Sequence, residues 1–176
     1  MASSWICPAQ QAVQMLGGTD INGATIQIDP KVTSGVVLFF TSVRCPYDDH
    51  YLGRMNDLHA RYGRNFRFYF VNSSPEDTPA AIQSEVRTRE SQIPYLIDQS
   101  QTIKRTFGAS KTTEVFVLKP EKGGFSIYYR GPVDDNPQVA ADADKSFLRD
   151  ALEGYLAGKP AIQSGARVAG CLIREP

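Results

Sequence analysis

The chain has 176 residues, a formal net charge of zero at pH 7 and a sequence pI near 6.7. Its 41% hydrophobic and 22% charged residues are ordinary for a globular protein and exclude a disordered or fibrous chain. A neutral chain lacks the basic excess typical of proteins that bind nucleic acids or anionic membranes, so we expect neither partner. The length favours one domain over residues 1–176, with 160–176 as a C-terminal tail.

The longest apolar run, residues 36–40, is far shorter than the roughly 20 residues that a membrane-spanning helix needs. The first residues lack the basic and apolar segments of an export signal, which favours a cytoplasmic location. Cys7, Cys45 and Cys171 are too few and too scattered for a disulfide framework, and their odd number leaves at least one thiol unpaired in a monomer.

Strands and helices alternate in the first half of the predicted structure. Hydrophobic spacing predicts a short helix at 10–16, a strand at 24–29, a fully buried strand at 36–40, an amphipathic helix from Pro46 to Gly63 and a strand at 66–71. An Asn22-Gly23 turn precedes the first strand. The order predicts a β-α-β crossover through Cys45.

The second half predicts another such unit followed by a hairpin. A helix runs from Pro79 to about 90, then come an extended segment at 94–98, a helix at 100–107 closed by Gly108, strands at 113–118 and 125–129, and a helix ending at Gly158. We therefore predict an α/β protein with a central mixed β-sheet and helices on both faces.

Cys45 stands between the end of a predicted buried strand and the start of a helix. Unpaired N–H groups and the helix dipole favour a thiolate there, and the neighbouring Arg44 adds to the effect. Pro46 suits the first helical turn because its missing N–H needs no partner. These residues fit a nucleophilic cysteine as well as they fit a buried, inert one.

Five segments in chain order carry a resemblance to a known family: Val37-Leu-Phe-Phe-Thr-Ser-Val-Arg-Cys-Pro46, Pro94-Tyr-Leu-Ile-Asp98, Gly108-Ala109 with Thr113-Glu-Val-Phe116, Tyr129-Arg-Gly-Pro-Val-Asp-Asp-Asn136, and Gly170-Cys-Leu-Ile173. From about Gly17 to Ile173 the chain resembles a bacterial peroxiredoxin-like branch of the thioredoxin-like superfamily. This branch is usually called the redoxin or alkyl-hydroperoxide-reductase/thiol-specific-antioxidant type. The resemblance implies a thioredoxin-like fold and redox chemistry at Cys45.

The motif departs from relatives with two active-site cysteines, because Asp48 stands where the second cysteine of Cys-x-x-Cys would be. A disulfide within this motif is impossible. Asp48 either assists proton transfer at Cys45 or, as we favour, is a first-turn acid stabilised by the helix dipole. Ser42 holds the position of the threonine or serine that precedes the reactive cysteine of peroxiredoxins, whereas Leu38 replaces their upstream proline.

The resemblance also suggests residues that bind substrate. Arg44 and Arg130 are candidates for the peroxiredoxin arginine, and Pro46, Thr113 and Arg130 are the candidate substrate-binding residues. Thr113 replaces the proline whose peptide bond is cis in thioredoxins. A cis bond before a residue other than proline costs about 2.5–4 kcal/mol, so we expect a trans bond and a reshaped loop opposite Cys45.

Cys171 follows a glycine-containing segment that reads as a flexible tail, in the family's Gly-Cys-x-Ile motif. It is either the thiol that resolves oxidised Cys45 or a small buried residue that anchors the terminus. Cys7 matches no motif and is interpreted as a bystander. His50 and His59 do not have metal-ligand spacing, so no metal is expected. Asp134-Asp135 is expected to form a turn and a helix N-cap.

Two hypotheses follow. The first is a thiol-dependent oxidoreductase with antioxidant activity, in which Cys45 attacks a peroxide or a protein disulfide, Cys171 resolves it and an external thiol reductant restores it. The second is a thioredoxin-fold binding or redox-sensing protein without turnover. Neither needs a cofactor, and either is compatible with a homodimer.

Overall fold

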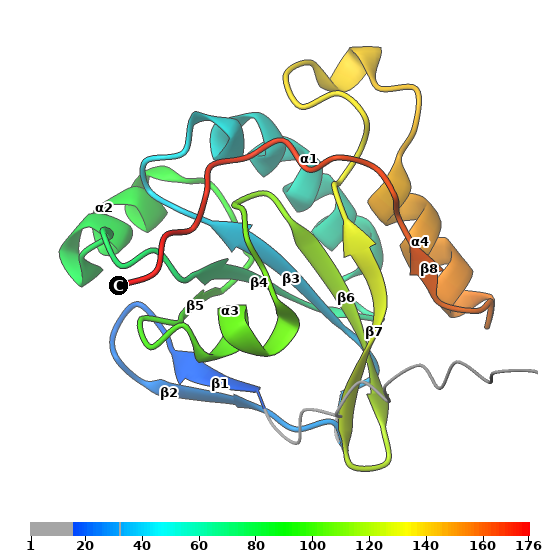
Figure 1. The fold of residues 1–176 in the computed structure, drawn as a ribbon, viewed down its shortest axis with the longest axis horizontal. Helices are drawn as coiled ribbons and strands as arrows, with labels where there is room; N and C mark the ends of the chain where they lie inside the picture. The colour runs from blue at the N-terminus through cyan, green and yellow to red at the C-terminus, as the bar shows by residue number, and fades with distance from the viewer. Residues whose placement is uncertain (1–15, 32) are drawn as a thin grey trace, which may run out of the picture.

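The computed structural model describes residues 16–31 and 33–176. Cys7 and residues 10–15 of the predicted first helix lie outside the described residues. The described chain forms one mixed sheet in the order β2-β1-β5-β4-β3-β6-β7-β8, with helices packed on it (Figure 1). The α/β architecture predicted from the sequence is confirmed.

The structure bounds the strands as β1 Leu16–Thr19, β2 Thr25–Ile28, β3 Val36–Thr41, β4 Arg67–Asn72, β5 Tyr95–Ile97, β6 Val115–Glu121, β7 Gly124–Gly131 and β8 Ile162–Gln163. The helices are α1 Pro46–Tyr62, α2 Pro79–Thr88, α3 Thr102–Phe107 and α4 Phe147–Leu156, and a 3-10 turn covers Ala140–Asp142. Each predicted element from residue 24 onward is present within a few residues of its predicted bounds.

β3 is the centre of the sheet. It pairs in parallel with β4 and antiparallel with β6, and all of its residues are buried. Successive side chains of a strand point to opposite faces of the sheet, so an apolar run such as this one needs cover on both sides.

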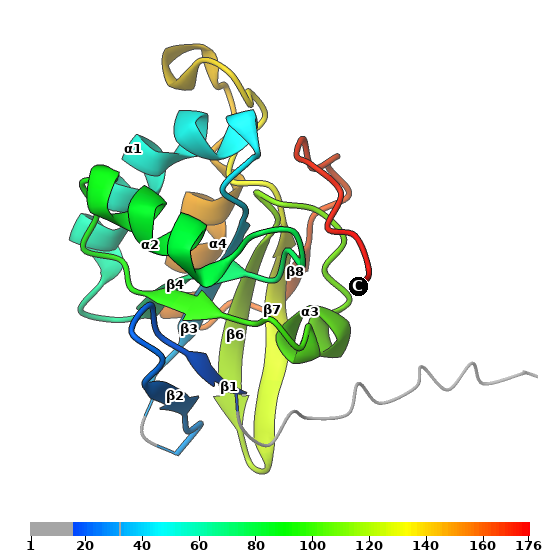
Figure 2. The ribbon, with the colours of Figure 1, turned by 90° about the vertical axis from the view of Figure 1, so that its left-hand side faces the viewer.

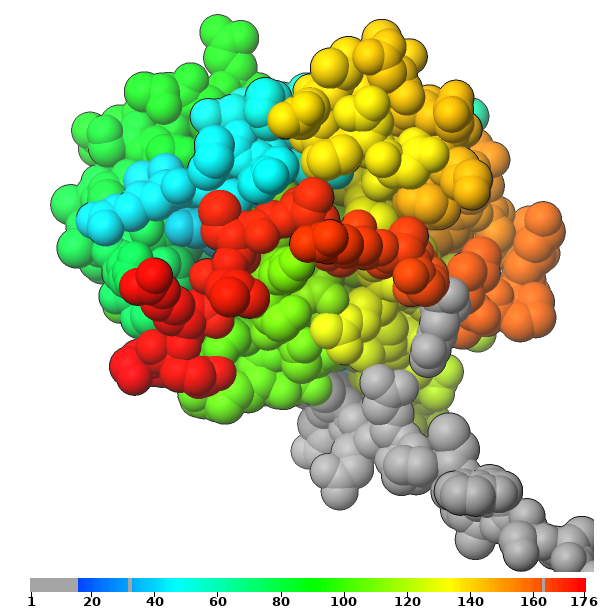
Figure 3. All heavy atoms as spheres, turned by 45° about the horizontal axis from the view of Figure 1, so that its top comes forward, coloured from blue at the N-terminus to red at the C-terminus, as the bar shows by residue number. Residues whose placement is uncertain are grey.

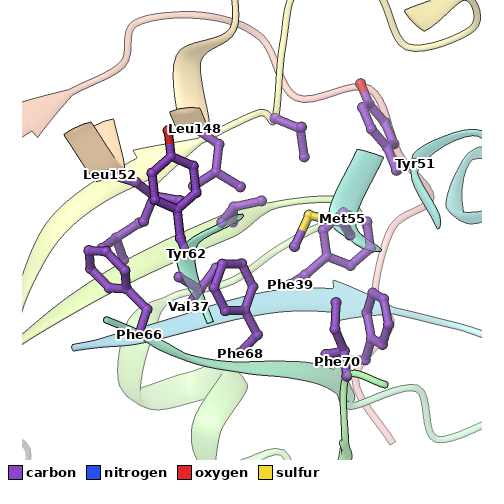
Figure 4. Packing of buried hydrophobic residues seen from close by; sticks show 14 of the residues in the cluster. Val37, Phe39, Tyr51, Met55, Tyr62, Phe66, Phe68, Phe70, Leu148 and Leu152 are labelled. Carbon is purple, nitrogen blue, oxygen red and sulfur yellow. The ribbon is translucent and has the colours of Figure 1, made fainter. Parts of the chain in front are cut away.

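The two faces of β3 pack into two separate clusters. Val37 and Phe39 face the cluster that contains the buried side chains of α1, α2 and α4 (Figure 4). Val36, Leu38 and Phe40 face the second cluster, which includes α3 and the residues Leu16 and Ile28 of the β1–β2 hairpin. Figure 2, turned by 90°, shows helices on both sides of the sheet.

Two strands, β1 and the edge strand β8, were not predicted from the sequence. β1 pairs with β2 through the predicted Asn22-Gly23 turn, where Gly23 has φ +82°. Leu16, the last residue of the predicted first helix, is instead a strand residue whose side chain is buried opposite Ile28. Pairing and burial in the second cluster decide its conformation. β8 is a two-residue strand that pairs with β7.

No helix in the described part of the chain has the length and apolar character required to cross a membrane. After β8, the C-terminal end crosses the surface between the start of α1 and the segment that follows α3 (Figure 3). This path brings residues 169–171 next to Thr112 and Thr113 and beside Cys45, which follows the carboxyl end of β3.

Candidate active site

Cys45 is the N-cap residue of α1, at the junction that the sequence predicted. Its backbone is extended, with φ −94° and ψ 112°, and its N–H donates to the Ser42 carbonyl oxygen at 3.2 Å. Pro46 takes the first helical position. Cys45 is only 4% exposed. Its sulfur therefore stands at the positive end of a 17-residue helix, in a site largely screened from water.

The sulfur of Cys45 is bonded to that of Cys171 in the structure. The two residues are 126 positions apart in the sequence, and their Cα atoms lie 5.9 Å apart, within the usual range for disulfides. Cys171 is partly exposed, so it is not the fully buried anchor that the sequence left open. The fold thus supplies a second sulfur that the motif around Cys45 lacks.

Thr112 joins the two cysteines through hydrogen bonds and was missed in the sequence analysis. Its hydroxyl donates to the Cys45 sulfur at 2.9 Å and accepts from the Cys171 N–H at 2.9 Å. The Thr112 N–H donates to the Cys171 carbonyl oxygen at 2.9 Å. Its position directly before Thr113, in the loop expected to face Cys45, was the one available signal.

Thr113 confirms the prediction made for its peptide bond, because none of the described peptide bonds is cis. The residue adopts φ +61°, a left-handed conformation that threonine rarely takes. Its N–H donates to the Phe40 carbonyl oxygen at 2.7 Å, and its hydroxyl donates to the Ala169 carbonyl oxygen at 2.5 Å. Thr113 therefore binds the protein's own C-terminal segment.

Asp48 lies in the first turn of α1, as in the interpretation that we favoured, and its carboxyl is buried. It is 1% exposed, and its Oδ2 accepts from the Thr41 hydroxyl at 2.6 Å and from the Ser42 N–H at 2.7 Å. Its Oδ1 is buried without a hydrogen-bond partner in the structure. Desolvation raises the pKa of Asp48 to about 7, against the smaller lowering effects of the two hydrogen bonds and of Arg89. The carboxyl can therefore hold or release a proton near neutral pH.

Arg89 is the guanidinium that faces this carboxyl, and sequence reasoning did not find it. It donates to the Tyr95 hydroxyl at 2.8 Å and to Thr41 Oγ1 at 3.3 Å, and its charge lowers the pKa of Asp48. Glu85, four residues earlier in the chain, forms an ion pair with Arg89 in which Oε1 of Glu85 lies 2.6 Å from Nη2 of Arg89. Arg89 lies 44 residues beyond Cys45 in the sequence, at the C-cap of α2, so no local pattern marked it.

The arginines named from the sequence occupy other places. Arg44 is exposed, beside Cys45 in the chain. Arg130 donates to Glu114 at 2.7 Å and to the Gly108 carbonyl oxygen at 2.8 Å, so it braces the loop that carries Thr112 and Thr113. Within the described residues neither guanidinium forms a hydrogen bond to Cys45.

Ser42 lies in the loop between β3 and Cys45, as predicted, and is 9% exposed. The structure ties its main chain to Cys45 and Asp48, while the nearest partner of its hydroxyl is the Arg44 N–H at 3.5 Å. The role that the resemblance implies for Ser42, donation from its hydroxyl to a bound peroxide, stays a prediction.

The predicted Asp134-Asp135 helix cap is wrong. Asp134 accepts from Asn136 N–H in a turn, as expected, but its carboxylate forms an ion pair with Arg54 at 2.6 Å. The next turn of helix begins after Val139. A buried guanidinium from α1 competes better for the carboxylate than the end of a short 3-10 turn. No cluster of three metal-ligating residues occurs among residues 16–31 and 33–176.

A family model described as "AhpC/TSA family" matches residues 9–133, which include Cys45 and the loop that holds Thr112. The chain belongs to the AhpC/TSA family. No curated protein matches the sequence.

Several solved structures are similar to the fold of this chain. An uncharacterized conserved protein from Geobacillus kaustophilus is 23% identical, covers 94% of this chain and 92% of its own, and has a TM-score of 0.79. A hypothetical protein from Sinorhizobium meliloti 1021 is 25% identical over 93% of this chain and 92% of its own, with a TM-score of 0.76. A thiol-disulfide oxidoreductase from Bacteroides fragilis NCTC 9343 is 13% identical, covers 84% and 98%, and has a TM-score of 0.60. The fold of this AhpC/TSA member is thioredoxin-like, as predicted.

Proposed function

We propose that the protein is a two-cysteine thiol peroxidase in which the Cys45 thiolate reduces a small hydroperoxide and Cys171 resolves the product. The observation that carries the proposal is the disulfide between a cysteine at the N-terminus of α1 and a distant cysteine held by the same threonine. A thiolate at a helix N-terminus is a good nucleophile, and a second thiol in bonding range protects its oxidised form.

The first step transfers one oxygen atom to sulfur. The thiolate of Cys45 attacks the terminal peroxide oxygen, the O–O bond breaks, and the alkoxide or hydroxide takes the proton that the Cys45 thiol released on ionising and leaves as alcohol or water. Cys45 becomes a sulfenic acid. In the second step the Cys171 thiolate attacks the Cys45 sulfur, the S–O bond breaks, and the hydroxide takes the proton that the Cys171 thiol released and leaves as water, which forms the disulfide. An external dithiol reduces the disulfide and completes the cycle.

Two features favour a hydroperoxide over a protein disulfide as the oxidant. Cys45 is 4% exposed and is bonded to Cys171 of the C-terminal segment, so a small molecule needs less displacement of that segment than a protein does. The family of the chain points the same way. Asp48, whose pKa is raised to about 7 by burial, lies one helical turn after Cys45 and is our candidate for the group that stores a proton near the site.

The test compares the wild-type chain with the variants Cys45→Ser, Cys171→Ser and Cys7→Ser. The pH dependence of alkylation gives the pKa of Cys45, and stoichiometric hydrogen peroxide followed by non-reducing peptide mapping gives the products. We expect a Cys45–Cys171 peptide in the wild type and in Cys7→Ser, a trappable sulfenic acid in Cys171→Ser, and no reaction in Cys45→Ser.

An ordinary Cys45 pKa together with a peroxide rate no faster than that of free cysteine would contradict the proposal. That result would favour the binding or sensing protein without turnover. Rapid reaction with a disulfide but not with peroxide would instead show that the oxidant is a disulfide.

A further inference from the structure

The last residues of the chain stay bound to the protein beyond Cys171. The Ile173 N–H donates to the Ser110 carbonyl oxygen at 3.0 Å. The Ile173 side chain is 7% exposed and packs in the cluster that contains Phe107. We call residues 173–175 the tail anchor. These contacts involve no sulfur atom, so they do not require the disulfide.

Gln101 connects the tail anchor to the end of a core strand. Its side-chain amide donates to the Ser73 carbonyl oxygen at 2.8 Å and to the Arg174 carbonyl oxygen at 2.7 Å. Ser73 directly follows β4, and both Gln101 and Ser73 are 0% exposed. Gln101 has φ +55°, a left-handed conformation that residues other than glycine rarely adopt. Such a conformation persists only where the surrounding structure holds it, and the two hydrogen bonds of the amide contribute to holding it here.

Lys104 binds the carboxylate of the tail anchor. Its side chain is 5% exposed, and its ammonium group donates to Gln101 Oε1 at 3.3 Å and to the Glu175 carboxylate. The hydrogen bond from Lys104 lowers the pKa of Glu175. The Glu175 side chain is 68% exposed, so water screens part of this ion pair. The pair therefore holds the tail mainly through a charge-assisted hydrogen bond of defined geometry.

The chain on the other side of Cys171 is held as well. The Thr113 hydroxyl donates to the Ala169 carbonyl oxygen at 2.5 Å. A Cβ atom at Gly170 would overlap the Thr112 carbonyl oxygen, so the tail passes close to that loop. Cys171 therefore lies on a short segment between this contact and the tail anchor. A segment that is held at both ends cannot carry its sulfur far, which keeps the local concentration of the thiol high.

We propose that Gln101 and Lys104 are positioning residues for the resolving step of the peroxidase reaction. They hold the tail anchor in place when the two sulfurs are not bonded, and so they keep Cys171 close to Cys45. The disulfide then forms before a second hydroperoxide reaches the sulfenic acid, because a thiol held near its target reacts at a high effective concentration. This inference rests on the proposed function, since that function supplies the sulfenic acid.

The sulfenic acid at Cys45 has two competing fates. In the first, the Cys171 thiolate attacks the Cys45 sulfur, an S–S bond forms and the S–O bond breaks. The hydroxide takes the proton that the Cys171 thiol released and leaves as water. In the second, the sulfenate sulfur attacks another hydroperoxide and the O–O bond breaks. The alkoxide or hydroxide takes the sulfenic proton and leaves as alcohol or water, and Cys45 becomes a sulfinic acid. Only the first fate depends on the distance between the two cysteines.

A disulfide exchange without peroxide measures how closely Cys171 is held to Cys45. In the full chain with Cys7→Ser, one equivalent of dithiobis(nitrobenzoate) modifies one of the two remaining thiols and releases a coloured thionitrobenzoate. The other thiolate then attacks the modified sulfur, the mixed disulfide breaks, and a second thionitrobenzoate leaves. The rate of this second release reports the approach of the two sulfurs, whichever thiol was modified first.

Variants of neighbouring tail residues test the ion pair. Glu175→Gln should slow the second release about tenfold, because a charged hydrogen-bond partner is lost. The matched control is Arg174→Gln, which removes an exposed ion pair with Glu76 and should leave the rate unchanged. Lys104→Met should slow the release as much as Glu175→Gln does. The double variant should be no slower than either single variant, because both changes remove the same interaction.

Gln101→Asn separates positioning from folding. Asparagine adopts the left-handed backbone more readily than glutamine, so this variant should remain folded in urea unfolding. Its side chain is shorter by one methylene group and cannot reach both carbonyl oxygens that Gln101 binds. The second release should therefore be about fivefold slower, as expected for the loss of a neutral hydrogen bond.

Equal rates of second release in all variants would overturn the proposal, and so would equal slowing in Arg174→Gln. A second arm treats the same proteins with excess hydrogen peroxide and measures the disulfide and the sulfinic acid of Cys45 by mass. We expect the slowed variants to accumulate more sulfinic acid, and equal amounts despite slowed release would also overturn the proposal.

The two arms separate this inference from the proposed function. Slowed release combined with no peroxide reaction in any of the proteins would support the hold on Cys171 and reject the peroxidase function. Equal release rates with an intact peroxide reaction would reject the two positioning residues and leave the peroxidase function in place.

Discussion

Replacement of Asp48 by Asn is expected to change how the stability of the protein depends on pH. Burial raises the pKa of this carboxyl from 3.8 to about 7. The folded protein therefore keeps a proton on Asp48 between about pH 4 and pH 7, where the unfolded chain releases it. Because the folded state binds more protons in this window, the free energy of unfolding falls as pH rises through it and levels off above pH 7.

The size of the effect follows from the shift. One pKa unit corresponds to about 1.4 kcal/mol. A shift of roughly three units therefore lowers the free energy of unfolding at pH 8 by an amount on the order of 4 kcal/mol. About 2–3 kcal/mol of this loss falls between pH 5 and pH 8. Asn keeps an oxygen that accepts from Thr41 and from the Ser42 N–H, as Oδ2 of Asp48 does, and it never acquires a charge. Asp48→Asn should thus be the more stable protein at pH 8.

Urea unfolding of the disulfide-bonded forms at pH 5 and at pH 8 tests the prediction, since Cys45 does not titrate in the disulfide. Glu85, whose pKa is also raised by burial, is common to both proteins and cancels in the comparison. A difference in unfolding free energy between the two proteins that stays constant from pH 5 to pH 8 would refute the reasoning. That result would mean that the carboxyl ionises in the folded state at its ordinary pKa.

Three further changes have defined outcomes. Thr112→Val should slow disulfide formation after peroxide by about tenfold relative to Thr112→Ser, because only serine keeps the hydroxyl that contacts both cysteines. Gly170→Ala should slow the same step in stopped-flow fluorescence, and Gly165→Ala should not. Arg54→Met should destabilise the fold by about 3 kcal/mol in urea unfolding, since Asp134 would remain buried without its cation, and Arg54→Met/Asp134→Asn should recover part of the loss.

The sequence by itself determined the elements that depend on near neighbours in the chain. The apolar run at 36–40, the spacing of apolar residues after Pro46 and the stop at Gly63 fix a buried strand followed by a helix, because strand and helix periodicities are local properties. The position of Cys45 at their junction follows directly. So does the trans bond at Thr113, whose cost in the cis form is a property of the peptide unit itself.

The sequence could name Cys171 through its resemblance to a family, but it could not place its sulfur beside that of Cys45. It did not predict that Asp48 is buried, and it overlooked Thr112 and Arg89. The pKa of Asp48 depends on its burial, on Thr41 and on an arginine 41 residues away, and the contact between the cysteines spans 126 residues.

Only the tertiary structure decides such contacts, because the free energy of a buried charge or of a sulfur–sulfur bond depends on which distant groups share its space. The residues near a position in the sequence do not show which distant groups will contact it in the fold. The local sequence thus specifies the helix whose N-terminus Cys45 occupies, while the folded sheet selects the residues that surround its sulfur.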